Sequence, residues 1–212
     1  TSEELFNQAL ENAENKAEIY HQLATIYQMQ ANFSKAKDFL KKSLKISVDN
    51  PDALLELNFC YDVLDEKEEC LEFFTKLIDQ DPYSYNCWYY LGNAYHKLSR
   101  YEEAIDAYDY AILINESFSS AYFNKGNALV NLDRYTEAIE IYKIVGESTD
   151  VYEIKRVPEE DSRGYAFHNL GCIYLSGLDV EINYELAAEY FEKAAEFGMS
   201  YSMRNLGLMY YR

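Results

Sequence analysis

The sequence has few of the residues that make turns. Only 8 glycines and 3 prolines occur among its 212 residues, well under the roughly 12% share that these two residues have in average proteins. A β-rich fold needs such residues at its many chain reversals, so their scarcity favours a helical fold. The chain also lacks an uninterrupted apolar stretch of about 20 residues, which excludes a membrane-spanning helix of ordinary length. With 49% hydrophobic and 26% charged residues, we expect a folded, soluble protein.

Basic residues are scarce as well. Lysine and arginine number 19 against 37 aspartates and glutamates, so the net charge is −18. This charge repels phosphate backbones and anionic lipid surfaces at long range. We therefore expect neither a nucleic-acid nor a membrane partner, whereas a basic protein or peptide partner would be attracted.

The four cysteines, Cys60, Cys70, Cys87 and Cys172, have no C-x-x-C spacing and form no dense framework. This pattern disfavours zinc and fits a reducing compartment, so the sequence predicts a cytoplasmic location. The chain begins with Thr1 rather than methionine, which leaves room for an upstream signal that has been removed.

Residue patterns for catalysis are missing. The three histidines, His21, His96 and His168, lie far apart in the sequence, and there is no glycine-rich phosphate loop or H-E-x-x-H motif. His168 and Cys172, four positions apart, could form a thiolate nucleophile or half of a metal site. No third ligand or orienting carboxylate has a matching spacing, so coincidence is the favoured interpretation. The sequence predicts no enzyme activity, no catalytic residues, no metal site and no cofactor.

An internal repeat of 34 residues organises the chain. Shifting the sequence by that number superimposes four anchors, Tyr20, Leu54, Trp88 and Tyr122. Apolar or small residues follow three, four and seven positions after each anchor, with Asn58 and Lys125 as exceptions. Because this spacing marks one face of a helix, each unit is predicted to open with an amphipathic helix.

The second half of each unit repeats a small residue followed four positions later by a bulky one. The small residues are Ala36, Cys70, Ala104 and Ala138, and the bulky ones are Leu40, Phe74, Tyr108 and Tyr142. A small residue lets two helix backbones approach closely, and the bulky one fills the groove beside that contact. The two helices of a unit are therefore predicted to pack as an antiparallel pair.

The pattern predicts a single array over residues 1–212. Its units are 17–50, 51–84, 85–118 and 119–150, followed by a polar loop insertion at 147–163 and altered units at 164–212. The second-half pattern also begins the chain, as Ser2, Phe6 and Ala9, so residues 1–13 are interpreted as a second helix whose first helix is missing. The last helix, from Tyr201, would leave an apolar face with Leu206 and Tyr210 uncovered unless another segment or chain packs there.

Residues 88–112, WYYLGNAYHKLSRYEEAIDAYDYAI, closely resemble the tetratricopeptide repeat. The family's columns hold Trp88, Leu91, Gly92, Tyr95, Ala104, Tyr108 and Ala111. Residues 119–145 are nearly as similar, and 17–46 and 51–82 more loosely, whereas 164–212 resemble the related Sel-one-like repeats. The resemblance implies an all-α, right-handed superhelical solenoid of antiparallel helix pairs that binds other proteins.

In such an array the first helices line a concave face, and the positions one and five residues after each anchor point into it. These positions in the four tetratricopeptide-like units hold no lysine or arginine, which argues against the carboxylate clamp by which some family members hold chaperone tails. Aromatic and amide side chains dominate there instead. The predicted peptide-binding residues are Phe59, Tyr89, Asn93, Phe123, Asn124, Asn127 and His168.

Two interpretations of these residues stay open. The amides can donate to and accept from an extended peptide backbone, but they can also bond their own backbone or face water. The rings can anchor a ligand or pack between helices. The sequence predicts a non-catalytic scaffold that holds a peptide or protein segment in its groove. The alternative is a structural module that forms homo-oligomers through its terminal helices, near Phe6 and Tyr210.

Overall fold

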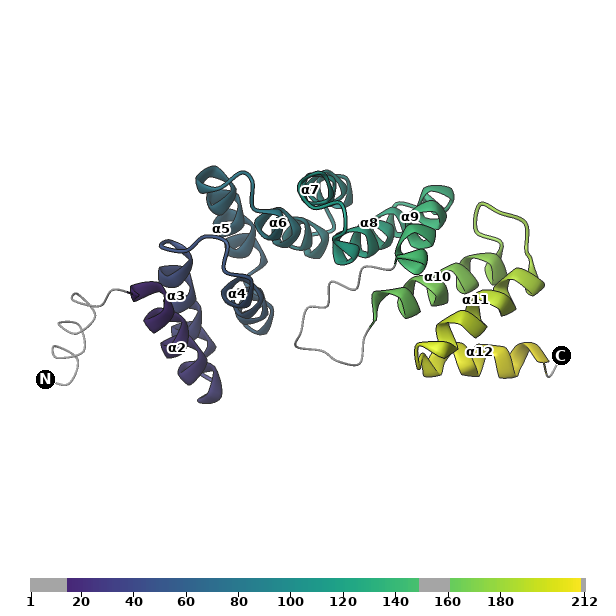
Figure 1. The fold of residues 1–212 in the computed structure, drawn as a ribbon, viewed down its shortest axis with the longest axis horizontal. Helices are drawn as coiled ribbons and strands as arrows, with labels where there is room; N and C mark the ends of the chain where they lie inside the picture. The colour runs from purple at the N-terminus through teal and green to yellow at the C-terminus, as the bar shows by residue number, and fades with distance from the viewer. Residues whose placement is uncertain (1–14, 149–160, 211–212) are drawn as a thin grey trace, which may run out of the picture. The chain divides into compact units, whose positions relative to one another are not determined.

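The computed structural model describes residues 15–148 and 161–210, which form eleven helices and no strand. The helices are α2 (Lys16–Met29), α3 (Phe33–Leu44), α4 (Pro51–Leu64), α5 (Lys67–Gln80), α6 (Tyr85–Lys97), α7 (Tyr101–Ile114), α8 (Ser119–Asn131), α9 (Tyr135–Glu147), α10 (Ser162–Ser176), α11 (Tyr184–Glu196) and α12 (Ser200–Tyr210) (Figure 1). The helix predicted over 1–13, and most of the loop predicted over 147–163, lie outside the described residues.

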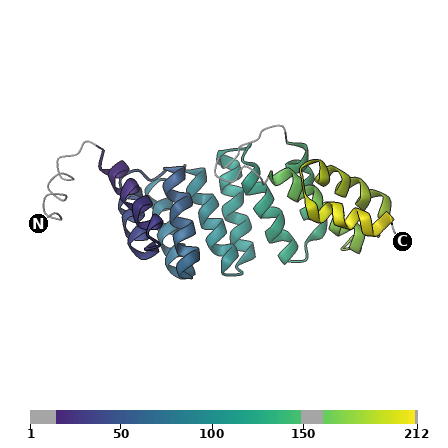
Figure 2. The same cartoon turned by 90° about the horizontal axis from the view of Figure 1, so that it is seen from below.

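The chain divides into two compact units, an N-terminal unit over Thr1–Ser99 and a C-terminal unit over Arg100–Arg212. Within each unit, helices that follow one another in sequence pack side by side in alternating directions (Figure 2). The prediction of an all-α fold built from antiparallel helix pairs is confirmed. None of the described helices is both long enough and apolar enough to cross a membrane.

A tight turn recurs with the period of the sequence repeat. Ala31, Asp65, Ser99 and Asp133 lie 34 residues apart, and each has a positive φ between 54° and 58°. A residue in this left-handed conformation is a common way to end a helix and reverse the chain. The backbone therefore repeats the same turn after α2, α4, α6 and α8, although none of these four positions is a glycine.

The small and bulky columns of the second helices form the core. Ala36, Cys70, Ala104 and Ala138 are at most 1% exposed, and so are the bulky residues that follow them by four positions. Several of the helix contacts need a glycine, and two of them join the helices of a pair. A Cβ atom on Gly126 of α8 would lie 2.6 Å from the Tyr142 ring of α9, and one on Gly171 of α10 would lie 2.6 Å from the Phe191 ring of α11. These glycines let aromatic rings of the following helix lie directly on the helix backbone.

Candidate functional site

Four of the seven predicted binding residues lie on two adjacent helices of the C-terminal unit. Phe123, Asn124 and Asn127 stand on α8 and His168 on α10, and all four are half-buried. The two helices are in contact, and Asn169 of α10 joins them. We call Phe123, Asn124, Asn127, His168 and Asn169 the α8–α10 surface.

Asn127 links three helices through its side-chain oxygen. Its Oδ1 accepts a hydrogen bond from Tyr142 Oη of α9 at 2.7 Å and another from Asn169 Nδ2 at 3.3 Å. Burial raises the pKa of the Tyr142 hydroxyl, so this group stays protonated and can donate. The Asn127 carbonyl is therefore used within the protein, and a ligand would meet the Nδ2 donor instead.

Phe123 belongs to an aromatic group at the same place. Its ring centroid lies 6.0 Å from that of Tyr142 and 6.0 Å from that of Tyr165 on α10. These separations fall within the range of favourable ring contacts. Phe123 thus packs between helices and still keeps part of its ring at the surface. Tyr165 was not among the predicted residues, because it falls outside the repeat columns that we expected to face inward.

His168 connects α10 to α12. Its Nδ1 lies 2.7 Å from Oγ of the fully buried Ser202, and its Nε2 lies 3.5 Å from Sγ of Cys172. Burial lowers the pKa of His168 and raises the pKa of the Cys172 thiol. Both groups are then neutral at neutral pH, which disfavours a reactive thiolate. Ser202 was not among the residues predicted from the sequence, although it lies 34 residues after His168.

The other three predicted residues lie on the N-terminal unit. Phe59 of α4 is 51% exposed, and its ring meets Phe33 of α3 edge-on at 5.8 Å. Tyr89 of α6 is only 8% exposed and packs at 5.1 Å against the Tyr90 ring. Asn93 is half-buried on the same helix. Phe59 therefore offers ring surface to a partner, and Tyr89 offers little.

A buried carboxylate on the N-terminal unit was also missed. Glu56 of α4 is 4% exposed, and its Oε2 lies 3.4 Å from both His21 Nε2 and Thr25 Oγ1 of α2. The neighbouring Glu56 carboxylate raises the pKa of His21 in spite of burial. The sequence could have indicated this buried carboxylate, because Glu56 is a lone acidic residue between Leu55 and Leu57.

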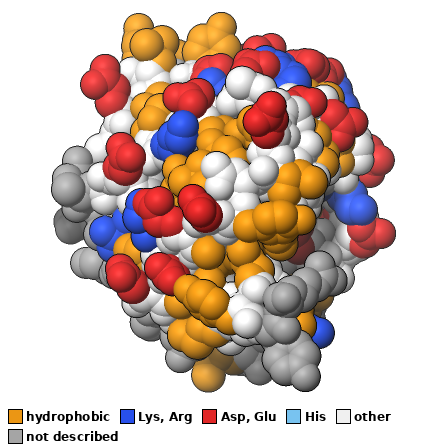
Figure 3. Space-filling view, turned by 90° about the vertical axis from the view of Figure 1, so that its right-hand side faces the viewer, with side chains coloured by type: hydrophobic (Ala, Val, Ile, Leu, Met, Phe, Trp, Pro, Cys, Tyr) orange, Lys and Arg blue, Asp and Glu red, His pale blue; other side chains and the backbone are white. Residues whose placement is uncertain are grey.

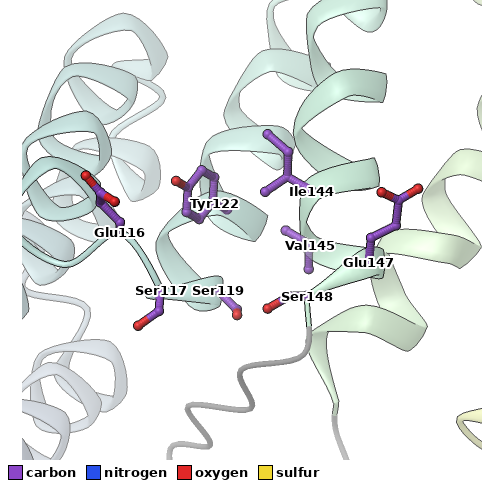
Figure 4. A pocket seen from close by; sticks show the side chains of 8 residues that line it. All are labelled: Glu116, Ser117, Ser119, Tyr122, Ile144, Val145, Glu147 and Ser148. Carbon is purple, nitrogen blue, oxygen red and sulfur yellow. The ribbon is translucent and has the colours of Figure 1, made fainter.

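The C-terminal unit also contains a pocket of about 590 Å³ between the α7–α8 connection, the start of α8 and the end of α9 (Figure 4). Its lining residues are Glu116, Ser117, Ser119, Tyr122, Ile144, Val145, Glu147 and Ser148. Two carboxylates and no basic side chain line it, so the pocket is unsuited to anions.

A second pocket, of about 470 Å³, is lined by Leu175, Tyr184, Asn205, Leu208 and Met209. Across residues 15–148 and 161–210, no three His, Cys, Asp or Glu side chains are placed to hold a metal ion.

Two family models, both described as tetratricopeptide repeat, match this chain. One matches residues 85–118, and the other matches residues 17–50 and 119–143. These three segments are similar to tetratricopeptide repeats. The match at 85–118 falls on the stretch whose residues carry the resemblance in the sequence, and the match at 119–143 includes Phe123, Asn124 and Asn127 of the α8–α10 surface. No curated protein matches the chain.

Solved structures of other proteins have the same fold, and two of them are described as TPR proteins. A crystal structure of MamA protein is 26% identical, has a TM-score of 0.60, and covers 85% of this chain and 91% of its own. YrrB, described as a TPR protein with an unusual peptide-binding site, is 23% identical and has a TM-score of 0.61. The match covers 94% of this chain and 96% of YrrB. TTC0263, a thermophilic TPR protein of Thermus thermophilus, is 17% identical and has a TM-score of 0.61. The match covers 92% of this chain and 100% of TTC0263. The chain thus has a tetratricopeptide-like fold over most of its length.

Proposed function

We propose that this tetratricopeptide repeat protein is a non-catalytic scaffold that binds an extended peptide or protein segment along the α8–α10 surface. The observation that carries the proposal is the gathering of amide, imidazole and aromatic side chains on two adjacent helices. An extended peptide has unpaired backbone donors and acceptors, and side-chain amides can serve both. Fold alone does not decide the ligand, so the argument rests on these residues.

Each residue of the surface has a distinct role in this proposal. The Nδ2 group of Asn127 donates to a peptide carbonyl while its Oδ1 is held by Tyr142 and Asn169. Because the amide is fixed by these bonds, little side-chain freedom is lost on binding. Phe123 contributes the exposed part of a ring that is already packed, and His168 contributes a neutral imidazole edge.

The remaining predicted residues form a second group. Phe59, Tyr89 and Asn93 are proposed to contact a partner on the N-terminal unit, with Phe59 as the main anchor because half of its surface is exposed. The net charge of −18 supports a basic partner and opposes nucleic acid and anionic membranes.

Finer assignments are proposed on the sequence pattern. Residues 164–212 are proposed to be Sel-one-like repeats. The tetratricopeptide-like units are proposed to span residues 17–50, 51–84, 85–118 and 119–150. A cytoplasmic location is supported by the cysteines, since all four are free thiols and three of them are buried.

Peptide selection followed by binding measurements tests the proposal. Peptides would be selected on the immobilised full chain from a random library, and their affinities measured by fluorescence anisotropy. The double variant Asn124→Ala, His168→Ala should bind the selected peptides at least about tenfold more weakly, as expected for residues central to an interface. Both side chains are half-buried, so circular dichroism would confirm that the variant stays folded.

Tyr110→Ala is the matched control, because Tyr110 is an exposed ring on α7, a second helix of the repeat, and is 51% exposed. It should leave the affinity unchanged. Equal affinity for wild type and the double variant would refute the α8–α10 surface as the binding site.

A further inference from the structure

The pocket at the end of α9 has an apolar wall between two acidic sides. Tyr122, Ile144 and Val145 form the wall, and Figure 4 shows Glu116 at one side of them and Glu147 at the other. The volume of about 590 Å³ falls within the range of pockets that hold small ligands. Both carboxylates are exposed, so a partner can reach them from solvent.

The two carboxylates form no ion pair with a described residue. Within residues 15–148 and 161–210, no lysine or arginine lies in ion-pair distance of Glu116 or Glu147. The basic residues beside the lining residues, along the chain or through a hydrogen bond, are paired with other acids: Lys125 with Asp109, Lys143 with Glu140, and Arg163 with Asp161. Lys193 interacts with Glu147 only as a more distant charge, and its Nζ lies 2.7 Å from Glu189. A cation that enters the pocket would therefore meet two acceptors that none of these bases uses.

The repeat does not account for these carboxylates. A residue that the fold requires recurs in its column, as the small residues of the second helices do. The columns of Glu116 and Glu147 hold other residues in the two preceding units, namely Val48 and Pro82 for the first, and Asp79 and Leu113 for the second. The combination of two glutamates is therefore specific to this unit.

The first repeat has a cation at the equivalent place. Tyr20 of α2 and Lys42 of α3 lie three repeat lengths before Tyr122 and Ile144. Lys42 Nζ lies 5.8 Å from the centroid of the Tyr20 ring, and it also lies over the Phe39 ring. At this separation the face of the ring attracts an ammonium group. The same column thus supplies a cation to the first unit and an isoleucine to the unit with the pocket.

The surrounding charges favour a cation over an anion. The C-terminal end of α9 attracts a cation and the N-terminal end of α8 repels one, so the two helix ends oppose each other and the carboxylates decide the sign. Burial, followed by the charges of Glu116 and Asp109, raises the pKa of the Tyr122 hydroxyl, so the negative charge acts on the ring as well. The face shown in Figure 3 likewise carries more acidic than basic side chains.

We propose that this pocket binds an arginine or lysine side chain of a protein partner, which takes the place that Lys42 takes in the first repeat. The aliphatic stem packs on Ile144, and the charged end lies over the Tyr122 ring between Glu116 and Glu147. Arginine fits better than lysine, because its planar group stacks on a ring and offers five donors in a fixed arrangement.

This site is distinct from the α8–α10 surface. Tyr122 and Asn124 are two positions apart on α8, which turns their side chains by about 200° around the helix. The pocket therefore opens on another side of α8, and it uses none of Phe123, Asn124 and Asn127. Either site can fail its test while the other stands.

Nuclear magnetic resonance titration of the full chain tests this proposal. The probe is the capped pentapeptide Gly-Ser-Arg-Ser-Gly, added up to about 10 mM to detect the weak affinity of a single side chain. The backbone amide signals of Ser117, Ser119 and Tyr122 should shift, whereas those of Asn124 and Asn127 should not. A lysine in place of the arginine should bind more weakly. Citrulline, which keeps the shape of arginine without its charge, should not bind.

The variant Ile144→Lys provides the decisive result. The new lysine restores the cation that Lys42 supplies in the first unit, so it should occupy the pocket and abolish binding of the arginine peptide. Ile144 is 49% exposed, and its column holds Lys42 and Lys76 in other units, so the variant should stay folded. Met29→Lys is the matched control, because it adds the same charge at a residue of α2 that is 85% exposed. It should leave binding unchanged.

Neutral variants measure what the carboxylates contribute. Glu116→Gln and Glu147→Gln should each weaken binding about two- to fivefold, as expected for exposed ion pairs, and the double variant about tenfold. Glu185→Gln removes an exposed carboxylate at the start of α11 and should have no effect. The proposal would be overturned by peptide-induced shifts at Asn124 and Asn127 instead of the pocket, by wild-type affinity in Ile144→Lys, or by the absence of any shift at about 10 mM.

Discussion

At the scale of single residues, two histidines are tuned in opposite directions by their surroundings. His21 lies 3.4 Å from the buried carboxylate of Glu56, which raises the pKa of the imidazole. His168 has Ser202 and Cys172 as its polar neighbours, and burial lowers its pKa. A nearby carboxylate favours the protonated ring, whereas burial without one favours the neutral ring.

We predict opposite pH dependence for His21→Gln and His168→Gln. The folded-state pKa of His21 lies above 6.5, so its stabilising contribution is complete below that pH and is lost as the pH rises through the folded-state pKa. The cost of His21→Gln should therefore be larger at about pH 5.5 than at about pH 8. The folded-state pKa of His168 lies below 6.5, so the unfolded chain takes up the proton first on acidification. The cost of His168→Gln should be smaller at about pH 5.5.

Urea unfolding of the wild type and both variants at the two pH values measures these differences. Glu56→Gln serves as a control, since removing the carboxylate should abolish the pH dependence attributed to His21. A His21→Gln cost that does not change with pH would contradict the assignment.

At the scale of helices, glycines decide how closely consecutive helices pack. Gly126 and Gly171 each receive an aromatic ring of the next helix, and both rings are fully buried, so they have no room to move aside. Gly207 has the same place in the repeat with open space above it. Glycine is thus required for helix packing in α8 and α10, whereas in α12 a larger residue can replace it without a clash.

We predict that Gly171→Ala destabilises the protein by about 1–3 kcal/mol, because the added methyl group overpacks the α10–α11 contact. Gly207→Ala should be neutral or stabilising by up to about 1 kcal/mol, because alanine is the better helix former. Free energies of unfolding from urea titration at low protein concentration measure both effects. Equal costs for the two substitutions would show that the Phe191 ring adapts to the extra atom.

At the scale of the whole molecule, the excess of 18 negative charges acts at long range on any partner. The side chains of the α8–α10 surface are uncharged at neutral pH, so they supply contacts without charge. Attraction of a basic partner would come from the summed field of the chain, and specificity from the amides and rings.

We predict that lysine-rich peptides selected on the chain associate about tenfold more slowly when the ionic strength rises from about 0.01 M to about 0.15 M, since the Debye length falls from about 30 Å to about 8 Å. Stopped-flow fluorescence measures the association rate. A neutral peptide of the same length is the control and should show little change. An association rate of the lysine-rich peptides that is insensitive to salt would assign recognition to the amide and aromatic contacts alone.

Much of the fold could be predicted from the sequence, because each helix packs mainly on the helices next to it in the chain. The 34-residue period, the anchors such as Trp88 and the small residues such as Ala104 are local patterns, and local patterns suffice when contacts join neighbours. The recurring turns at Asp65 and Asp133 follow the same period, although their positive φ was not expected without glycine.

The sequence by itself determined the helical class, the repeat and the pairing of helices, whereas the tertiary structure decided the state of the individual candidate residues. The burial of Tyr89, the internal bonds of Asn127 and the contact of His168 with Ser202 each depend on which side chain of another helix fills the neighbouring space. A repeat period places a residue on a face of its helix, but it does not say whether the space opposite is filled. That is why Gly171 and Gly207, alike in sequence, differ in the structure.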